Sequence, residues 1–335
     1  MSGGLSRVWW IAVSLLAGLW WAAPVAAAPR CAAADAIPWR AVVPGVWVWL
    51  PPDGGEVAPS NGGHVMPVSV VIAGREAGVI DPGPSYRHGL RLRRSLACRF
   101  GARVRWIVNT HAHAENVLAN AAFADDIAAG RIALLASAPT REGMAQRCPD
   151  CLASLVRRVG QPAMAGTEIV LPTHTLAEGD VLRVGRIALR VMPLEHGHTD
   201  GDLVLWDARR RVLWAGGLAY QDRVPELAQG QVQGWLEALD RLERLRPRHL
   251  IAATWSTSSG AAPPPALGAT RDYLKGLSAG VLAAMDRGVQ AHEAGQVDLP
   301  AFASWAGYGT RHGFNVQRAW RELEPVWMDQ GAAPR

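Results

Sequence analysis

Two histidines one residue apart, His111 and His113, stand in the segment NTHAHAENVL, and an acidic residue, Glu115, follows them. Side chains at alternate positions of an extended segment point the same way, so both imidazoles can reach one metal ion. A third histidine, His198, lies in EHGHTDGD, where a second expected strand meets a loop. Three neutral imidazoles with one open position are the pattern of a catalytic zinc site rather than a structural one.

A zinc ion at this site would lower the pKa of a bound water towards ~7. Glu115 would then orient the water or accept its proton, and it is the candidate catalytic residue. Two alternatives stay open at this point. Three histidines also suit iron, copper or manganese, and they could be core or surface histidines that bind no metal.

The elements that must position these residues form two series of strands, each followed by helices. Apolar alternation and β-branched runs predict strands at 41–52, 66–85, 104–110, 131–137, 166–176, 180–194, 201–217 and 249–255. Helical periodicity predicts helices at 85–100, 114–130, 139–159, 234–246, 269–287 and 313–324. Two sheets packed together, with helices outside, bury both series. The ligand site is expected where strand ends and loops of the two halves meet.

Four segments, GVIDPGPS, THAHAEN, EHGHTDGDLVLW and VLWAGGLAYQDRVPEL, resemble in their order and spacing the metallo-β-lactamase superfamily. Within it, the chain is most similar to exported SoxH-related metallohydrolases, including those called quinoprotein relay system zinc metallohydrolases. The likeness covers roughly residues 40 to 325. It implies an α/β fold, a four-layer αββα sandwich with one or two zinc ions at the sheet edge. It assigns His111, His113 and His198 to the first metal site.

The chain departs from the family at the second metal site. The family has aspartate and histidine after its first two histidines, and this chain has Glu115 and Asn116. Gly217 stands where the family has a bridging aspartate, and Trp255 or Thr254 stands where it has the last histidine. We therefore expect one zinc ion and no tightly bound second ion.

Four residues are candidates for contacts around the ligands rather than to the metal: Asp81, Asn116, Thr199 and Asp202. Asp81 matches an aspartate that in the family is a structural partner near the site. It could hold the second nitrogen of a histidine, or simply form the turn before Pro82.

The N-terminus has the pattern of an export signal. Arg7 precedes an apolar run from Val8 to Ala23, and small residues follow. We predict a signal peptide at 1–28 and one domain at 29–335, with a C-terminal helical extension from about 262 to 335. The protein is expected in the periplasm or outside the cell, with an uncleaved anchor as the alternative. The mature part has no stretch long and apolar enough to span a membrane.

Four cysteines remain in an exported chain, which favours disulfides. Cys148 and Cys151 form a Cys-x-x-Cys pair, for which a local disulfide, free or redox-active thiols, and metal binding are alternatives. Cys31 and Cys98 are the pair that remains for a second bridge.

The net charge of +5 comes from scattered arginines, without an aromatic-interleaved basic stripe, so no nucleic-acid partner is expected. The first functional hypothesis is a mono-zinc hydrolase of an unknown ester, thioester or amide-like small molecule. The second is a catalytically degenerate binding or accessory protein that serves a periplasmic quinoprotein dehydrogenase system. A thiol–disulfide protein built on Cys148 and Cys151 is the third.

Overall fold

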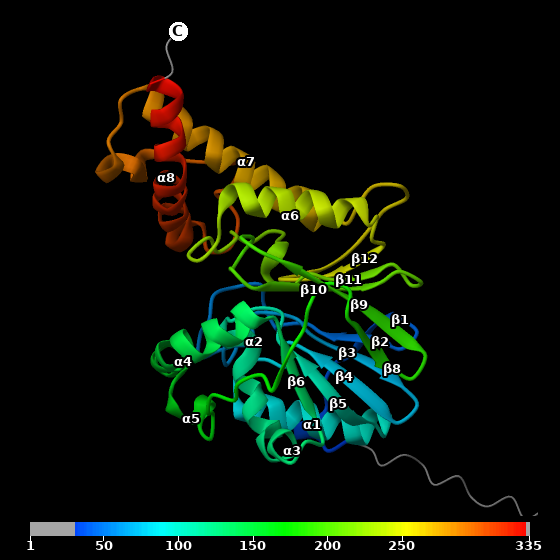
Figure 1. Ribbon diagram of the computed structural model, residues 1–335. Helices are drawn as coiled ribbons and strands as arrows, with labels where there is room; N and C mark the ends of the chain where they lie inside the picture. The colour runs from blue at the N-terminus through cyan, green and yellow to red at the C-terminus, as the bar shows by residue number, and fades with distance from the viewer. Residues whose placement is uncertain (1–30, 333–335) are drawn as a thin grey trace, which may run out of the picture.

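The computed structural model describes residues 31–332 and arranges them in four layers, with helices outside two packed sheets (Figure 1). One sheet has seven strands in the order β1-β2-β3-β4-β5-β6-β7, and the other has six in the order β13-β12-β11-β10-β9-β8. The α/β sandwich expected from the sequence is confirmed. The predicted signal peptide lies outside the described residues.

The strands of the first sheet begin antiparallel and end parallel. They are β1 (Arg40–Val43), β2 (Val46–Trp49), β3 (Val68–Ala73), β4 (Glu76–Ile80), β5 (Arg103–Val108), β6 (Ala133–Ala136) and β7 (His174–Thr175). The second sheet contains β8 (Val181–Val184), β9 (Ile187–Leu194), β10 (Asp202–Asp207), β11 (Val212–Trp214), β12 (His249–Ile251) and β13 (Trp255–Thr257).

The helices cover the outer faces of the two sheets (Figure 1). Those of the first half are α1 (Tyr86–Phe100), α2 (Ala114–Val117), α3 (Ala124–Ala128), α4 (Ala138–Val159) and α5 (Gln161–Met164). Those of the second half are α6 (Val232–Arg244), α7 (Pro265–Asp286) and α8 (Tyr308–Ala332). The helices α7 and α8 fill most of the region where the sequence predicts a C-terminal extension.

The core between the sheets consists of side chains that alternate inward from both of them. Val48 and Val71 from the first sheet and Leu189 and Leu205 from the second belong to this one cluster. Burial of such side chains is the main favourable term in folding. Trp214 also joins the sheets directly, since its indole nitrogen donates to the Ser69 hydroxyl at 2.8 Å. The sheets therefore hold fixed the loops at their edge.

One predicted strand is largely absent. The segment 166–176 was expected to be extended throughout, but only His174–Thr175 pairs as β7. Pro172 has no backbone N–H to give to a neighbouring strand. The rest of the segment therefore runs as a loop before it reaches β6.

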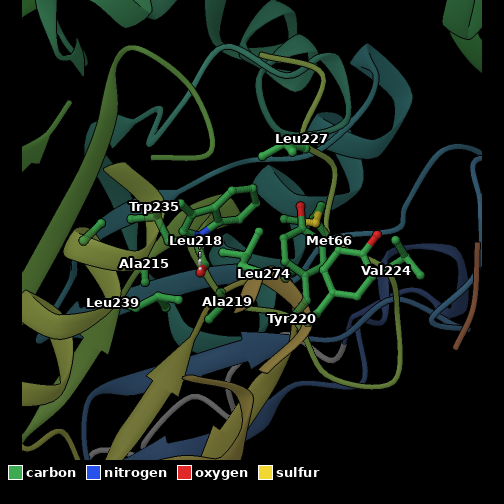
Figure 2. Packing of buried hydrophobic residues seen from close by; sticks show 14 of the residues in the cluster. Met66, Ala215, Leu218, Ala219, Tyr220, Val224, Leu227, Trp235, Leu239 and Leu274 are labelled. Carbon is green, nitrogen blue, oxygen red and sulfur yellow. Dashed lines mark hydrogen bonds between the residues drawn. The ribbon is translucent and has the colours of Figure 1, made fainter. Parts of the chain in front are cut away.

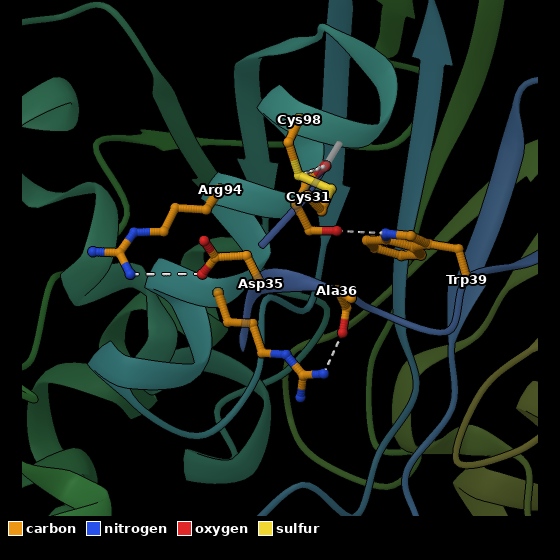
Figure 3. Close-up of a disulfide and its surroundings, with 8 residues drawn as sticks. Cys31, Asp35, Ala36, Trp39, Arg94 and Cys98 are labelled. Carbon is orange, nitrogen blue, oxygen red and sulfur yellow. Dashed lines mark hydrogen bonds and ion pairs between the residues drawn. A yellow bond between two sulfur atoms is a disulfide. The ribbon is translucent and has the colours of Figure 1, made fainter. Parts of the chain in front are cut away.

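A disulfide joins Cys31 to Cys98 and ties the start of the described chain to α1 (Figure 3). A local bridge between Cys148 and Cys151 is wrong, because both are free thiols on α4. The helix continues unbroken through both residues. Cys148 is buried, and Cys151, three residues further on, is partly buried against the same core cluster, but the two sulfurs are not bonded.

The disulfide suggests an oxidising environment. Among residues 31–332, no helix has the length and apolar character needed to cross a bilayer.

The stability of the fold is expected to fall in acid, with His64 as one identifiable cause. Burial lowers the pKa of His64 to about 4 from 6.5, and Arg91 adds to the shift. Between these two pH values, His64 therefore binds a proton in the unfolded chain and not in the folded chain. The stabilisation is present above pH 6.5 and is lost as the pH falls towards 4, by about 3 kcal/mol at most.

Urea unfolding of wild type and His64→Phe at pH 7 and pH 4.5 checks this prediction. The wild type should lose more free energy of unfolding on acidification than the variant, by about 2 kcal/mol. His88 is present in both proteins, but its pKa is lowered by burial and also by His64, so the difference between the two proteins reports both histidines together. Equal losses in the two proteins would contradict the role of His64.

Candidate metal centre

Two loops at the sheet edge bring the three histidines together. His111 and His113 lie between the end of β5 at Val108 and the start of α2 at Ala114. His198 lies in the loop that joins β9 to β10. All three side chains are buried, with at most 8% of the residue exposed.

The three imidazoles face a common point. Their ring centroids lie 4.9 Å apart for His111 and His113, 5.0 Å for His111 and His198, and 4.6 Å for His113 and His198. One nitrogen from each ring lies within 4.8 Å of the others. Segments separated by 85 residues thus supply ligands to one site.

A chain of hydrogen bonds that begins at Asp81 determines which ring nitrogen of His111 carries the proton. Asp81 accepts from the Thr110 backbone N–H at 2.9 Å and from the Thr110 hydroxyl at 2.7 Å. Because that hydroxyl gives its proton to Asp81, its oxygen accepts from Nδ1 of His111 at 2.8 Å. Nε2 of His111 is left with a lone pair, and this buried atom has no hydrogen-bond partner.

The proton on His198 is placed in the same way. Its Nδ1 lies 2.8 Å from the backbone carbonyl of Glu226, which can only accept, so Nδ1 carries the proton. Nε2 of His198 then also presents a lone pair, and it lies 3.2 Å from Nδ1 of His113. Hydrogen bonds to the second nitrogen are the usual way in which proteins orient metal-binding histidines.

Lone pairs that converge in a buried site require a cation. Burial, together with the neighbouring histidines, lowers the pKa of His111 and His198 well below the ordinary value, so these rings are neutral. Three imidazole nitrogens, with Nε2 of His111 unpartnered, match the donor set of an open metal site. The residues therefore fit a metal ion held by His111, His113 and His198.

The residues expected around the ligands are close to the site, and none donates a lone pair to it. Asn116 lies beside Asp81 and donates a hydrogen bond to it. Burial raises the pKa of Asp81 to about 7, and a cation nearby would favour its charged form. Asp202 accepts from the backbone and hydroxyl of Thr199 at 2.9 and 2.7 Å, which closes the loop that carries His198.

Glu115 lies at the site together with a residue that the sequence did not single out. Oε1 of Glu115 is 4.0 Å from Nδ1 of His113. The carboxylate of Glu226 shares this neighbourhood, because ligand atoms of His113, Glu115 and Glu226 lie within 4.8 Å of one another. Glu226 lies near the end of the segment VLWAGGLAYQDRVPEL, but nothing in that segment marked it as a site residue. Thr110 directly precedes His111 in the sequence, so a contact between the two could have been predicted.

Two of the positions expected for a second metal ion, Gly217 and Trp255, hold no ligand, whereas Glu115 lies at the site. A Cβ at Gly217 would lie 2.1 Å from Cδ2 of His198, so the imidazole occupies the space that a side chain there would need. Gly217 lies in η3 (Gly216–Leu218), directly after β11. Trp255 begins β13 and packs against the core between the sheets.

Aromatic side chains pack against the His198 imidazole. The Trp235 ring on α6 lies 5.2 Å from the His198 ring, and the Tyr220 ring lies 6.1 Å from it. The Trp235 indole donates to the Leu218 carbonyl at 2.9 Å, as Figure 2 shows. These contacts leave the imidazole little freedom to rotate.

Replacement of Thr110 by valine is expected to weaken metal binding by about 10- to 100-fold, the typical effect of losing a partner that orients a ligand. The substitution removes the only acceptor that Nδ1 of His111 has among the described residues, and it leaves Asp81 without the hydroxyl proton. Competition with a chromogenic zinc chelator measures the affinity. Thr110→Ser keeps the hydroxyl and is the matched control. Wild-type metal affinity in Thr110→Val would contradict the role of the hydrogen-bond chain from Asp81 through Thr110 to His111.

Comparison with known proteins supports the same conclusion. A family model described as "Metallo-beta-lactamase superfamily" matches residues 62–254. No curated protein matches the chain. Among solved structures, a metallo-beta-lactamase from Pontibacter korlensis superimposes with a TM-score of 0.53 and 16% identity, covering 72% of this chain and 99% of that one.

A second solved structure is similar over more of the chain. The stereoselective inverting sec-alkylsulfatase Pisa1 from Pseudomonas sp. matches with a TM-score of 0.61 and 16% identity over 89% of this chain. The match covers 52% of the sulfatase, so this chain spans about half of its length. At these identities the two likenesses establish the fold alone.

Proposed function

Since the chain belongs to the metallo-beta-lactamase superfamily, we propose that it is an exported hydrolase with a single zinc ion. The observation that carries the proposal is the convergence of three buried imidazoles without a fourth protein nitrogen among the described residues. A site of this kind keeps one position open for water or substrate. The empty ligand positions at Gly217 and Trp255 support one ion rather than two.

The protein supplies binding, orientation and a proton acceptor. When bound, zinc supplies Lewis acidity and acidifies water to near neutral pH. His111, His113 and His198 would hold it. Glu115, beside His113, accepts the proton of the attacking water and can return it to the leaving group.

The substrate class that we propose is a small ester, thioester or amide. A link to periplasmic quinoprotein dehydrogenase systems is part of the proposal and rests on the resemblance of the sequence alone. Export rests on the N-terminal pattern and agrees with the Cys31–Cys98 disulfide.

Hydrolysis of a panel of esters, thioesters, amides and alkyl sulfates by the mature protein tests the proposal. Wild type should hydrolyse at least one class. His113→Ala should lose this activity with its metal, and Glu115→Gln should keep the metal while turnover falls by about 100-fold or more, the usual contribution of a general base. Equal rates of hydrolysis by wild type and His113→Ala would contradict the proposal of a metal-dependent hydrolase.

A second candidate function is a binding or accessory protein that has lost catalysis. The burial of the three histidines and the loss of the second-site ligands favour it. It predicts bound metal without turnover of any class in the panel.

A further inference from the structure

A cavity of about 490 Å³ lies beside the candidate metal centre, on the far side of Tyr220. Tyr220 forms part of its wall, and the same ring lies 6.1 Å from the ring of His198. Leu50, Pro67, Arg223 and Thr254 also line it. A volume of this size is ordinary for a small-molecule site. The cavity is therefore a candidate small-molecule site that shares the Tyr220 ring with the surroundings of the metal centre.

Arg223 is a buried charge in the wall of this cavity. It is 4% exposed, and its Nη1 donates to the Val65 carbonyl at 2.8 Å. Its Nε is buried without any hydrogen-bond partner. Among residues 31–332, no carboxylate lies within 4.0 Å of this guanidinium. A buried arginine is normally paired with an anion, because an unpaired charge is costly to remove from water.

The contacts that Arg223 makes within the protein do not supply this anion. Its guanidinium carbon lies 5.8 Å from the centre of the Tyr220 ring, which Figure 2 shows next to Met66 and Val224. A ring face attracts a cation only weakly compared with a carboxylate. Two carboxylates line the cavity, Asp53 and Asp222, but both are exposed, whereas Arg223 is buried. The buried charge of the cavity is therefore positive.

We propose that this cavity binds an oxyanion group, a carboxylate, sulfate or phosphate, through Arg223. The guanidinium presents parallel N–H donors that match two oxygens of such a group. On the proposed function, this group is a remote part of the substrate, separated from the reacting bond by the width of Tyr220. Binding of the remote group then positions the reacting bond at the metal centre.

Calorimetric titration of the mature protein with sodium sulfate, phosphate or acetate, at constant ionic strength set with chloride, tests the site. We expect at least one oxyanion to bind to wild type and to bind about 10-fold or more weakly to Arg223→Met, since hydrogen bonds to charged groups are strong. Arg186→Met removes the same charge from an exposed turn and should bind like wild type. The three salts separate the three oxyanion classes.

His111→Ala distinguishes this site from the metal centre. An oxyanion held by Arg223 should still bind to His111→Ala, whereas one held by a metal would be lost there and kept in Arg223→Met. Thr254→Phe narrows the cavity without touching Arg223, and it should weaken binding even if Arg223→Met folds poorly. Absence of oxyanion binding to wild type, or equal binding to wild type and Arg223→Met, would overturn the proposal. Oxyanion binding without hydrolysis of any substrate would overturn only the proposed function.

Discussion

Replacement of His111 by alanine is expected to remove bound metal from the protein and, with it, any hydrolysis. The substitution deletes the buried Nε2 that has no other partner, and two imidazoles then remain. The affinity should fall by more than the 10- to 100-fold that is typical of losing an orienting partner. Mass spectrometry of the mature protein, purified without chelator, should find one equivalent of zinc in wild type and none in the variant.

Thermal unfolding gives a second readout that needs no substrate. A ligand that binds only the folded state at 100 times its Kd adds about 2.7 kcal/mol to the free energy of unfolding. Zinc should therefore raise the Tm of wild type and leave that of His111→Ala unchanged. His174→Ala, which removes an exposed histidine of β7, is the matched control and should behave like wild type. More than one equivalent retained after dialysis would contradict the single-ion site, and no zinc in wild type would contradict the centre itself.

The fold and the ligand histidines could be predicted because their signals are local. Alternation along β2 to β5 and β8 to β11 shows which faces are buried, and the segment containing His111 and His113 directly follows a buried strand. Motif order then places His198 at the same sheet edge. The strands follow from the period of the side chains, whereas the assignment of all three histidines to one site is what the resemblance to the family implies.

The partners of the ligands could not be predicted, because they are brought to the site by tertiary structure. Glu226 acts through its backbone carbonyl, a group that every residue has, so its role depends only on where the loop passes. Arg223 lines its cavity from the same loop, and no pattern in the sequence assigned it that role. The state of Cys148 and Cys151 could not be predicted either, because residues three apart on a helix are neighbours whether or not their sulfurs are bonded.

Gly217 was predicted to be a missing ligand position, but its structural role was not visible in the sequence. The absence of a side chain removes a bridging carboxylate and also makes room for His198. A Cβ would lie 2.1 Å from Cδ2 and 2.5 Å from Nε2 of that ring, closer than carbon and nitrogen atoms can approach. The absence of a side chain at Gly217 and the position of His198 are therefore one steric arrangement. The second site should not return through Gly217→Asp alone.

Replacement of Gly217 by alanine is accordingly expected to damage the first metal site. The added methyl group must displace the His198 imidazole, which the Glu226 carbonyl and the Trp235 ring hold in place. Overpacking of this kind costs about 1–3 kcal/mol of stability. A displaced ligand should also weaken zinc binding by about 10- to 100-fold or more. Chelator competition and urea unfolding measure the two effects.

The control for this variant is another glycine-to-alanine change that meets no neighbour. Gly268 lies in α7, and a Cβ there would have no atom within 4 Å. Gly268→Ala should therefore bind zinc like wild type and gain about 0.4–1 kcal/mol in stability. If Gly217→Ala bound zinc with wild-type affinity, His198 would not need the space above Gly217. Restoration of a ligand at this position would then be compatible with the first site, and the steric explanation for a single ion would fail.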